Sequence, residues 1–202
     1  MSASARRLWA VEWRQGDEVL LAIEPTANEI RRAAPALAAF YNDEHNRRMM
    51  AHDETLDVDD VVDYYGELRG EGGHPFLLRL GAADGELMGD ADLRNIDGPT
   101  GEFAIMVGAR AAQGRGFGTR FAIMLHAFAF QVLDLGRVYM SVIPANAASQ
   151  RLFVKLGYEA DDSPEAREFA DEETDLTMSL GRERFETRWA GDLAAVKLFE
   201  RA

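Results

Sequence analysis

The sequence predicts a single layered domain of mixed helical and strand structure, and three observations support this. The chain has 202 residues, which is enough for one domain with a sizeable core. Hydrophobic residues make up 47% of it, so its composition is that of a folded protein. Segments with helical periodicity alternate with short strand-like segments, and no repeat or low-complexity linker separates them. We therefore expect one domain over residues 1–202, of α/β or α+β class.

The chain begins with two short strands and a helix. Arg7 to Trp13 and Glu18 to Ile23 flank the turn sequence Gln-Gly-Asp, which predicts a hairpin or two short strands. Pro25 to Tyr41 carries apolar residues at helical spacing and predicts a helix. We expect Pro35 to break or kink this helix, because proline lacks a backbone donor and clashes with the preceding turn.

A polar stretch, NDEHNRRMMAHDETLD, separates this helix from the next one, and we expect it to be mobile. Asp57 to Leu68 is a second amphipathic helix, which the glycines that follow it end. The periodicity then changes to that of strands joined by tight turns. This change predicts strands at Pro75 to Leu80, Glu86 to Ile96 and Glu102 to Val107.

The second half of the chain continues the alternation of helices and strands. Helices are expected from Thr119 to Asp134 and from Ala147 to Leu156, with a strand from Arg137 to Ile143 between them. Leu176 to Leu180 is the expected final strand. Thr187 to Arg201 is expected to form a C-terminal helix.

Composition excludes several classes of protein. The chain has no cysteine, which excludes disulfides, thiolate metal sites and a cysteine nucleophile, and its four histidines form no ligand set, so we expect no metal. The net charge of −13 argues against nucleic-acid binding, and an acidic surface can attract cationic substrates. The N-terminus lacks the apolar region of a signal peptide, and the most apolar run is too short to span a bilayer. We expect a cytoplasmic protein that binds neither nucleic acid nor membranes.

Residues 113–119, QGRGFGT, are the most informative stretch. Three glycines ahead of a helix can present free backbone N–H groups to an anion such as phosphate, but they can equally form a plain turn. The stretch matches neither the P-loop, since no Gly-Lys-Ser/Thr sequence follows, nor the dinucleotide pattern GxGxxG. These seven residues alone leave the anion site and the turn equally open.

The region from Glu102 to Tyr158 resembles the GCN5-related N-acetyltransferase (GNAT) superfamily, in particular its ribosomal-protein-alanine and spermidine acetyltransferase branch. The acetyl-CoA motif of that superfamily corresponds to QGRGFG beginning at Gln113, after a strand that ends in Val-Gly. The second motif corresponds to Asn146, a serine at 149 where the family has alanine, and LFVKLGY ending at Tyr158. The motifs occur in the family's order and at its separations, and the likeness extends over roughly residues 86–160.

The resemblance implies the GNAT fold, a mixed and mostly antiparallel central sheet flanked by helices. Its core would span about residues 18–180, with an N-terminal strand extension over 1–17 and a C-terminal helical extension over 181–202. The resemblance also implies acetyl-CoA as the acyl donor, without a metal. The residues that it places at the cofactor are Met106, Val107, Gly108, Gln113, Gly114, Arg115, Gly116, Phe117, Gly118, Thr119, Asn146, Ser149 and Phe153.

The implied reaction is direct attack of a primary amine on the thioester, with a base that removes the amine proton. Glu102 is the expected base, because several members carry a glutamate at this strand. Many members use a tyrosine as general acid where this chain has Phe153, and Ser141 is our preferred substitute. The acceptor would be a protein N-terminus, a polyamine, an amino acid or an antibiotic amine. A catalytically silent acyl-CoA-binding module is the alternative, and a homodimer is an expectation from relatives alone.

Overall fold

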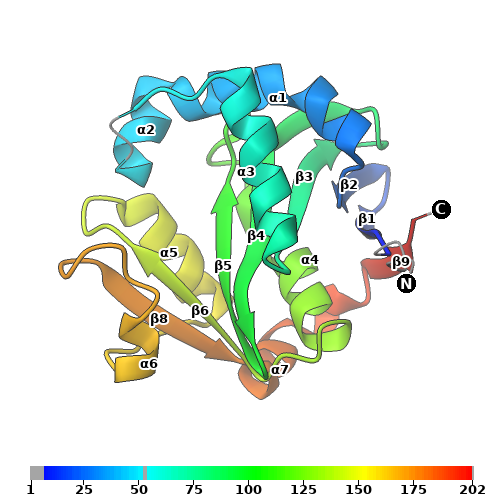
Figure 1. The fold of residues 1–202 in the computed structure, drawn as a ribbon. Coiled ribbons are helices and arrows are strands. Elements are labelled where there is room, and N and C mark those ends of the chain that lie inside the picture. Colours follow the sequence, from blue (N-terminus) through cyan, green and yellow to red (C-terminus); the bar gives the residue numbers. More distant parts are fainter. Residues whose placement is uncertain (1–6, 52–53, 202) are drawn as a thin grey trace, which may run out of the picture.

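One mixed sheet of nine strands organises the structure, a computed structural model that describes residues 7–51 and 54–201 (Figure 1). The strands are β1 (Trp9–Gln15), β2 (Glu18–Ile23), β3 (His74–Leu80), β4 (Glu86–Asp97), β5 (Thr100–Met106), β6 (Arg137–Val142), β7 (Glu159–Ala160), β8 (Leu176–Gly181) and β9 (Val196–Glu200). The helices are α1 (Ala27–Asn42), α2 (Glu44–Met50), α3 (Val58–Gly70), α4 (Phe117–Gln131), α5 (Ala147–Leu156), α6 (Pro164–Arg167) and α7 (Arg182–Leu193), with a 3-10 turn at Arg110–Ala112.

The strand order is β7-β8-β6-β5-β4-β3-β2-β1-β9. Neighbouring strands are antiparallel except for β5 and β6. The parallel pairing of β5 with β6 runs only from Thr100 opposite Arg137 to Glu102 opposite Tyr139. Beyond that point the two strands diverge (Figure 1). The split leaves one edge of β5 without a strand partner from Phe103 onward, and it decides where the functional site lies.

Helices cover both faces of the sheet, and each face has its own core. On one face α4 is apolar on all sides, which is typical of a fully buried helix, and its Phe121 and Phe128 are inaccessible to solvent. On the other face α1 and α3 pack against the sheet through residues such as Leu37 and Tyr65. The predicted α+β class and the layered arrangement are confirmed. No helix in the described part of the chain is long and apolar enough to cross a membrane.

Helix α1 does not break at Pro35, contrary to the prediction. The helix runs from Ala27 to Asn42 with Pro35 inside it. Pro35 is on the exposed side, whereas Ala34 and Leu37 are fully buried. The packing of the apolar side therefore outweighs the loss of one backbone hydrogen bond.

The polar stretch after α1 was expected to be mobile, but most of it is structured. It contains α2, and the Asp43 carboxylate caps this helix by accepting from the N–H groups of His45 and Asn46. Residues 52–53 lie outside the described residues, and with them His52. The prediction failed because α2 is stabilised by contacts with segments far away in the sequence, as the site below shows.

The C-terminal helix predicted over residues 187–201 is present only as far as residue 193 and is wrong beyond it. The last helix, α7, ends at Leu193, and Val196–Glu200 forms strand β9 on the outer edge of β1. Arg201 then binds Glu29 of α1 at 2.6 Å, and this hydrogen bond lowers the pKa of Glu29 to about 2. Both ends of the described chain thus extend the sheet, and β9 pairs the backbone groups that β1 would otherwise leave exposed at the sheet edge.

Candidate active site

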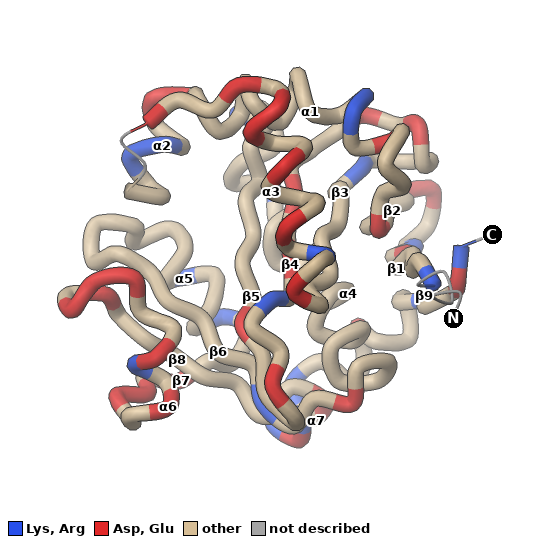
Figure 2. Tube along the Cα trace, viewed as in Figure 1, with Lys and Arg blue, Asp and Glu red and all other residues tan. Residues whose placement is uncertain are grey.

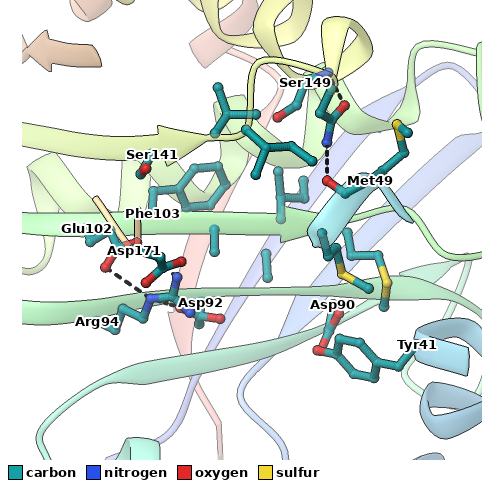
Figure 3. Close-up of a pocket in the computed structure, with 18 of the residues that line it drawn as sticks. Tyr41, Met49, Asp90, Asp92, Arg94, Glu102, Phe103, Ser141, Ser149 and Asp171 are labelled. Carbon is teal, nitrogen blue, oxygen red and sulfur yellow. Dashed lines mark hydrogen bonds and ion pairs between the residues drawn. The ribbon is translucent and has the colours of Figure 1, made fainter. Parts of the chain in front are cut away.

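Two adjoining pockets open where β5 and β6 separate. The loop pocket, of ≈ 440 Å³, is lined by residues 105–107, by much of the stretch 112–119 and by the first turns of α5. The acid pocket, of ≈ 270 Å³, is lined by β4, β5 and β6 and by side chains from α1, α2 and α3 (Figure 3). The residues that line both are Met49, Met50, Ile105, Met106, Asn146 and Ser149. The pockets therefore form one continuous site around the end of β5.

The glycine stretch forms one wall of the loop pocket. Gly114 and Gly116 have φ values of +72° and +82°, a conformation that favours glycine. Gly116 is the N-cap of α4 and provides no side-chain cap for this helix. The first N–H groups of α4 and the positive end of its dipole therefore face the pocket, which suits a phosphate.

Positive side chains complete the loop pocket. Arg151 and Lys155 of α5 line it together with His45, and no aspartate or glutamate of the described chain does. Figure 2 shows the basic residues on α2 and α5 and the acidic residues along α3 and the segment before β8. The pyrophosphate of coenzyme A needs this combination of free amides and cations, and its extended arm can hydrogen-bond to the open edge of β5. The residues present thus fit the cofactor.

Side-chain amides hold the glycine stretch against β5 and α2. Gln113 Nε2 donates to the Val107 carbonyl at 2.9 Å and to Asn46 Oδ1 at 3.1 Å. Asn46 Nδ2 in turn donates to the carbonyls of Phe40 and Gly108. A Cβ at Gly108 would lie 2.4 Å from Cγ of Phe40, so only glycine lets α1 pack this closely. This network fixes α2 over the junction of the two pockets.

The remaining residues predicted at the cofactor are divided between the two pockets and the core. Those that line the loop pocket are Met106, Val107, Gln113, Gly114, Gly116, Gly118, Thr119, Asn146 and Ser149. Phe117 is buried in the core, with the guanidinium of Arg115 5.0 Å from its ring centroid. Phe153 lines the acid pocket instead. Asn146 accepts from the N–H of Ser149 and donates to the Met49 carbonyl, so it joins α5 to α2 where the pockets meet.

The acid pocket contains five carboxylates and one guanidinium among the described residues. Asp90, Asp92 and Arg94 alternate along β4 and therefore point to one face of the sheet. Glu102 stands opposite Arg94 on β5, and Asp171 and Asp175 belong to the segment before β8 (Figure 3). A pocket with this charge balance favours a cation.

Glu102 lies in this pocket with only 5% of its surface exposed. Its Oε1 accepts from Arg94 Nη2 at 2.9 Å. Its Oε2 accepts from Arg94 Nε at 3.1 Å and from Asn95 Nδ2 at 2.7 Å. Both oxygens of the expected base are thus already occupied by donors.

The two aspartates of β4 are also buried, and burial raises the pKa of each. Asp90 accepts from the hydroxyls of Tyr41 and Tyr65 at 2.6 and 3.0 Å, and its pKa is raised to about 7. Asp92 is 8% exposed, and burial, opposed by Arg94 and aided by the charge of Glu102, raises its pKa to about 6. Both groups therefore titrate close to neutral pH.

Ser141 on β6 faces the acid pocket from the opposite side (Figure 3). Its hydroxyl donates to Asp175 Oδ2 at 3.5 Å. Phe153 is 3% exposed and carries no group that can donate a proton. Tyr158 is directed away, into a hydrogen bond of 2.6 Å with the buried His126. Ser141, the substitute expected from the sequence, is therefore a hydroxyl that lines the acid pocket and is the candidate proton donor.

Sequence reasoning missed most of the acid pocket, although one signal was available. The strand sequence GDADLR places charged side chains at alternate positions of a segment that is otherwise buried. A polar face on an interior strand indicates a lined cavity. Tyr41, Tyr64 and Asp171 carry no comparable local signal, because only the tertiary structure brings them to β4.

Comparison with known proteins bears on this site. The sequence model of the acetyltransferase (GNAT) domain family matches residues 22–159. No curated protein sequence matches the chain significantly.

Several solved structures share the fold. RimJ of Mycobacterium smegmatis, in complex with CoA-disulfide, has 18% identity and a TM-score of 0.66, with 93% of this chain and 96% of that one covered. The spermidine N-acetyltransferase of Vibrio cholerae, in complex with CoA and spermine, has 17% identity and a TM-score of 0.66, with 82% and 97% covered. An aminoglycoside acetyltransferase in complex with coenzyme A and kanamycin has 18% identity and a TM-score of 0.64, with 83% and 98% covered.

Proposed function

The chain belongs to the acetyltransferase (GNAT) domain family, and from this premise we propose that it transfers an acetyl group from acetyl-CoA to a primary amine of a cationic acceptor. One observation carries the proposal: a basic pocket built on a glycine stretch and an acidic pocket share their walls at the end of β5. The first pocket suits an anionic cofactor and the second a cationic substrate. Their junction is where the reacting groups would meet.

We propose that the loop pocket binds the cofactor, which supplies an activated acetyl thioester. Backbone N–H groups from Gln113 to Thr119 hold its phosphates, and Arg151 and Lys155 add positive charge. The open edge of β5 at Met106 and Val107 offers backbone groups to the extended arm. Holding both substrates in one site supplies much of the acceleration.

The acid pocket would bind the acceptor and remove its proton. An alkyl ammonium must lose a proton before it can attack a carbonyl. Glu102, expected from the sequence, and Asp92 are the candidates for this base. Ser141 is the candidate proton donor. The excess of carboxylates in the acid pocket favours acceptors with a second cationic group. Two proteins of the same fold have been crystallised with such molecules, spermine and kanamycin.

Thiol release from acetyl-CoA tests this function directly, since the chain has no cysteine to give a background signal. The matched substrates are 1,4-diaminobutane and butylamine, which share a reacting amine and differ in the second cation. We expect the diamine to have a kcat/KM about 10-fold higher, because a second ion pair in a partly desolvated pocket contributes on the order of 1 kcal/mol. Equal values would remove the cationic preference, and no release with any amine, spermine and kanamycin included, would contradict the transferase assignment.

A further inference from the structure

Asp92 has a buried carboxylate oxygen that no donor reaches. Its Oδ1 has no hydrogen-bond partner in the described part of the protein. Its Oδ2 accepts from the Tyr64 hydroxyl at 3.2 Å, and Arg94 Nε is 3.8 Å from Oδ1, which is too far for a hydrogen bond. Buried polar atoms in folded proteins are nearly always paired. Asp92 lines the acid pocket, and its unpaired oxygen therefore marks a place for a donor from a bound molecule.

Glu102, by contrast, accepts hydrogen bonds at both of its carboxylate oxygens. Three donor groups of Arg94 and Asn95 occupy its two oxygens at 2.7 to 3.1 Å. A carboxylate offers about four lone-pair sites to donors, and three of those of Glu102 are in use. Glu102 therefore has room for one further donor, at Oε1. Asp92 accepts only from the Tyr64 hydroxyl, and its Oδ1 accepts no hydrogen bond from the described residues.

The groups around Asp92 also favour a cation at Oδ1. The titratable and charged groups that share the pocket or pack against its β4 wall are Asp90 and Arg94 on β4, Glu102 on β5, Tyr41 on α1, Tyr64 and Tyr65 on α3, and Asp171 and Asp175 before β8. Arg94 is the only cation in that set, and its two strongest contacts go to Glu102. Arg94 therefore reaches Asp92 only as an ion pair of 3.8 Å without a hydrogen bond, which compensates the negative charge of ionised Asp92 in part.

We propose that Asp92, and not Glu102, binds the ammonium group of the acceptor through Oδ1 and takes its proton. One N–H bond of the ammonium breaks and an O–H bond forms on Oδ1, which leaves a neutral amine and a neutral carboxylic acid. The proton passes to solvent after the acetylated product departs. This inference rests on the proposed function. Glu102 is then a positioning residue, which holds Arg94 so that it does not neutralise Asp92.

The titration of Asp92 is compatible with this role. Its pKa, raised to about 6 by burial, leaves it mostly ionised at neutral pH and still able to accept a proton. The proposal predicts opposite effects for a substitution of Asp92 and a substitution of Glu102. Replacing Asp92 removes the base, whereas replacing Glu102 frees Arg94 to pair with Asp92 and removes a neighbouring negative charge. The second change should lower the pKa of Asp92.

The test is the pH dependence of kcat/KM for spermine and for kanamycin, measured by thiol release with Asp92→Asn and Glu102→Gln. We expect the wild-type rate to fall as the pH decreases through about 6. Asp92→Asn should reduce kcat/KM at pH 8 by about 100-fold or more and lose this acid limb. Glu102→Gln should keep a limb that is shifted to lower pH. Asp63→Asn, on the exposed side of α3, is the matched control and should behave as wild type.

Binding measurements add a readout that does not depend on turnover. Calorimetric titration of spermine into the complex with CoA, at pH 6 in two buffers of different ionisation enthalpy, counts the protons released. Wild type should release a fraction of a proton, because the ammonium displaces the proton of Asp92, and Asp92→Asn should release less. The affinity for CoA should be the same in both, and Asp92→Glu should recover part of the activity.

The two possible failures are distinguishable. If Asp92→Asn keeps the wild-type rate and acid limb while Glu102→Gln loses both, Glu102 is the base and the inference is wrong, although the proposed function stands. If wild type binds CoA but releases no thiol with either amine, the proposed function fails and the role of Asp92 fails with it.

Discussion

The loop pocket and the acid pocket share a wall but are built in different ways. The loop pocket, where we propose that the cofactor binds, is lined mainly by one short stretch, residues 113–119, and by two cations from α5. The acid pocket is assembled from side chains on α1, α3, β4, β5, β6 and the segment before β8. An anion can be held by contiguous N–H groups, whereas a cation in this fold requires carboxylates brought together from distant segments.

The two pockets also differ in their effect on the stability of the folded state. The glycine conformations and free amides of the loop pocket bury no unpaired charge. The acid pocket buries Asp90 and Asp92 next to each other on β4, and burial raises the pKa of both. Groups that destabilise the fold persist where function needs them. This difference supports our proposal that the acid pocket carries the chemistry and the loop pocket mainly binds the cofactor.

The largest effect should come from Gly116→Asp, which alters the loop pocket alone. An aspartate at φ +82° is strained, although aspartate adopts positive φ more often than most residues, and it places a negative charge at the N-terminus of α4. We expect CoA affinity, measured by calorimetry, to fall by about 100-fold, or about 2.7 kcal/mol. Spermine binding should be unaffected.

Gly16→Asp is the matched control for this variant. Gly16 lies in the hairpin between β1 and β2 with φ +60°, and a Cβ there meets no atom within 4 Å. Gly16→Asp adds the same charge at a similar positive φ, away from both pockets. Its CoA affinity should therefore be that of wild type. Unchanged CoA affinity in Gly116→Asp would show that the phosphates bind elsewhere and would break the contrast between the pockets.

The next largest effect is on the free energy of unfolding and comes from Asp92→Asn in the acid pocket. The folded-state pKa of Asp92 is about 6, above the usual value for an unfolded chain. Ionised Asp92 therefore destabilises the fold above pH 6, and this cost disappears as the pH falls through the folded pKa toward the unfolded one. Asp92→Asn should stabilise the protein at pH 8 by on the order of 1–3 kcal/mol, which corresponds to a Tm increase of roughly 2–10 °C.

Thermal unfolding at pH 8 and about pH 4 checks this expectation. The stabilisation should fall to a small fraction at the lower pH, where Asp92 is protonated in the folded state and about half protonated in the unfolded chain. Asp63→Asn changes an exposed aspartate of the neighbouring α3 and should leave the Tm within about 1–2 °C of wild type at either pH. A lower Tm of Asp92→Asn at pH 8 would mean that the carboxylate has a stabilising partner.

The smallest effect should come from Ser141→Ala, which probes the other side of the acid pocket. A thiolate is a tolerable leaving group, so loss of a proton donor should reduce kcat by only about 3- to 10-fold, with KM for acetyl-CoA unchanged. Ser179→Ala on β8 is the control, since Ser179 also donates to an aspartate, Asp161, at 2.6 Å but lines neither pocket. Equal rates in both variants would exclude Ser141 as the donor.

The difference between the pockets also explains how far sequence reasoning reached. The glycine stretch and, apart from α2, the order of the strands and helices through Gly157 follow from local periodicity and from residues adjacent in the chain. The helical prediction for residues 187–201 failed because β9 depends on the edge of β1, which no local pattern reports. The continuity of α1 through Pro35 likewise depends on the core that α1 packs against.

The sequence by itself determined the fold class, the family resemblance and the position of the glycine stretch, because each is encoded in contiguous residues with a characteristic periodicity or motif. The composition and charge of the acid pocket, by contrast, are set only by the tertiary structure. The divergence of β5 from β6, the pairing of Glu102 with Arg94 and the unpaired oxygen of Asp92 arise from segments far apart in the chain. Burial and charge at such a site are properties of the assembled neighbours, and they decide which of two carboxylates can accept a proton.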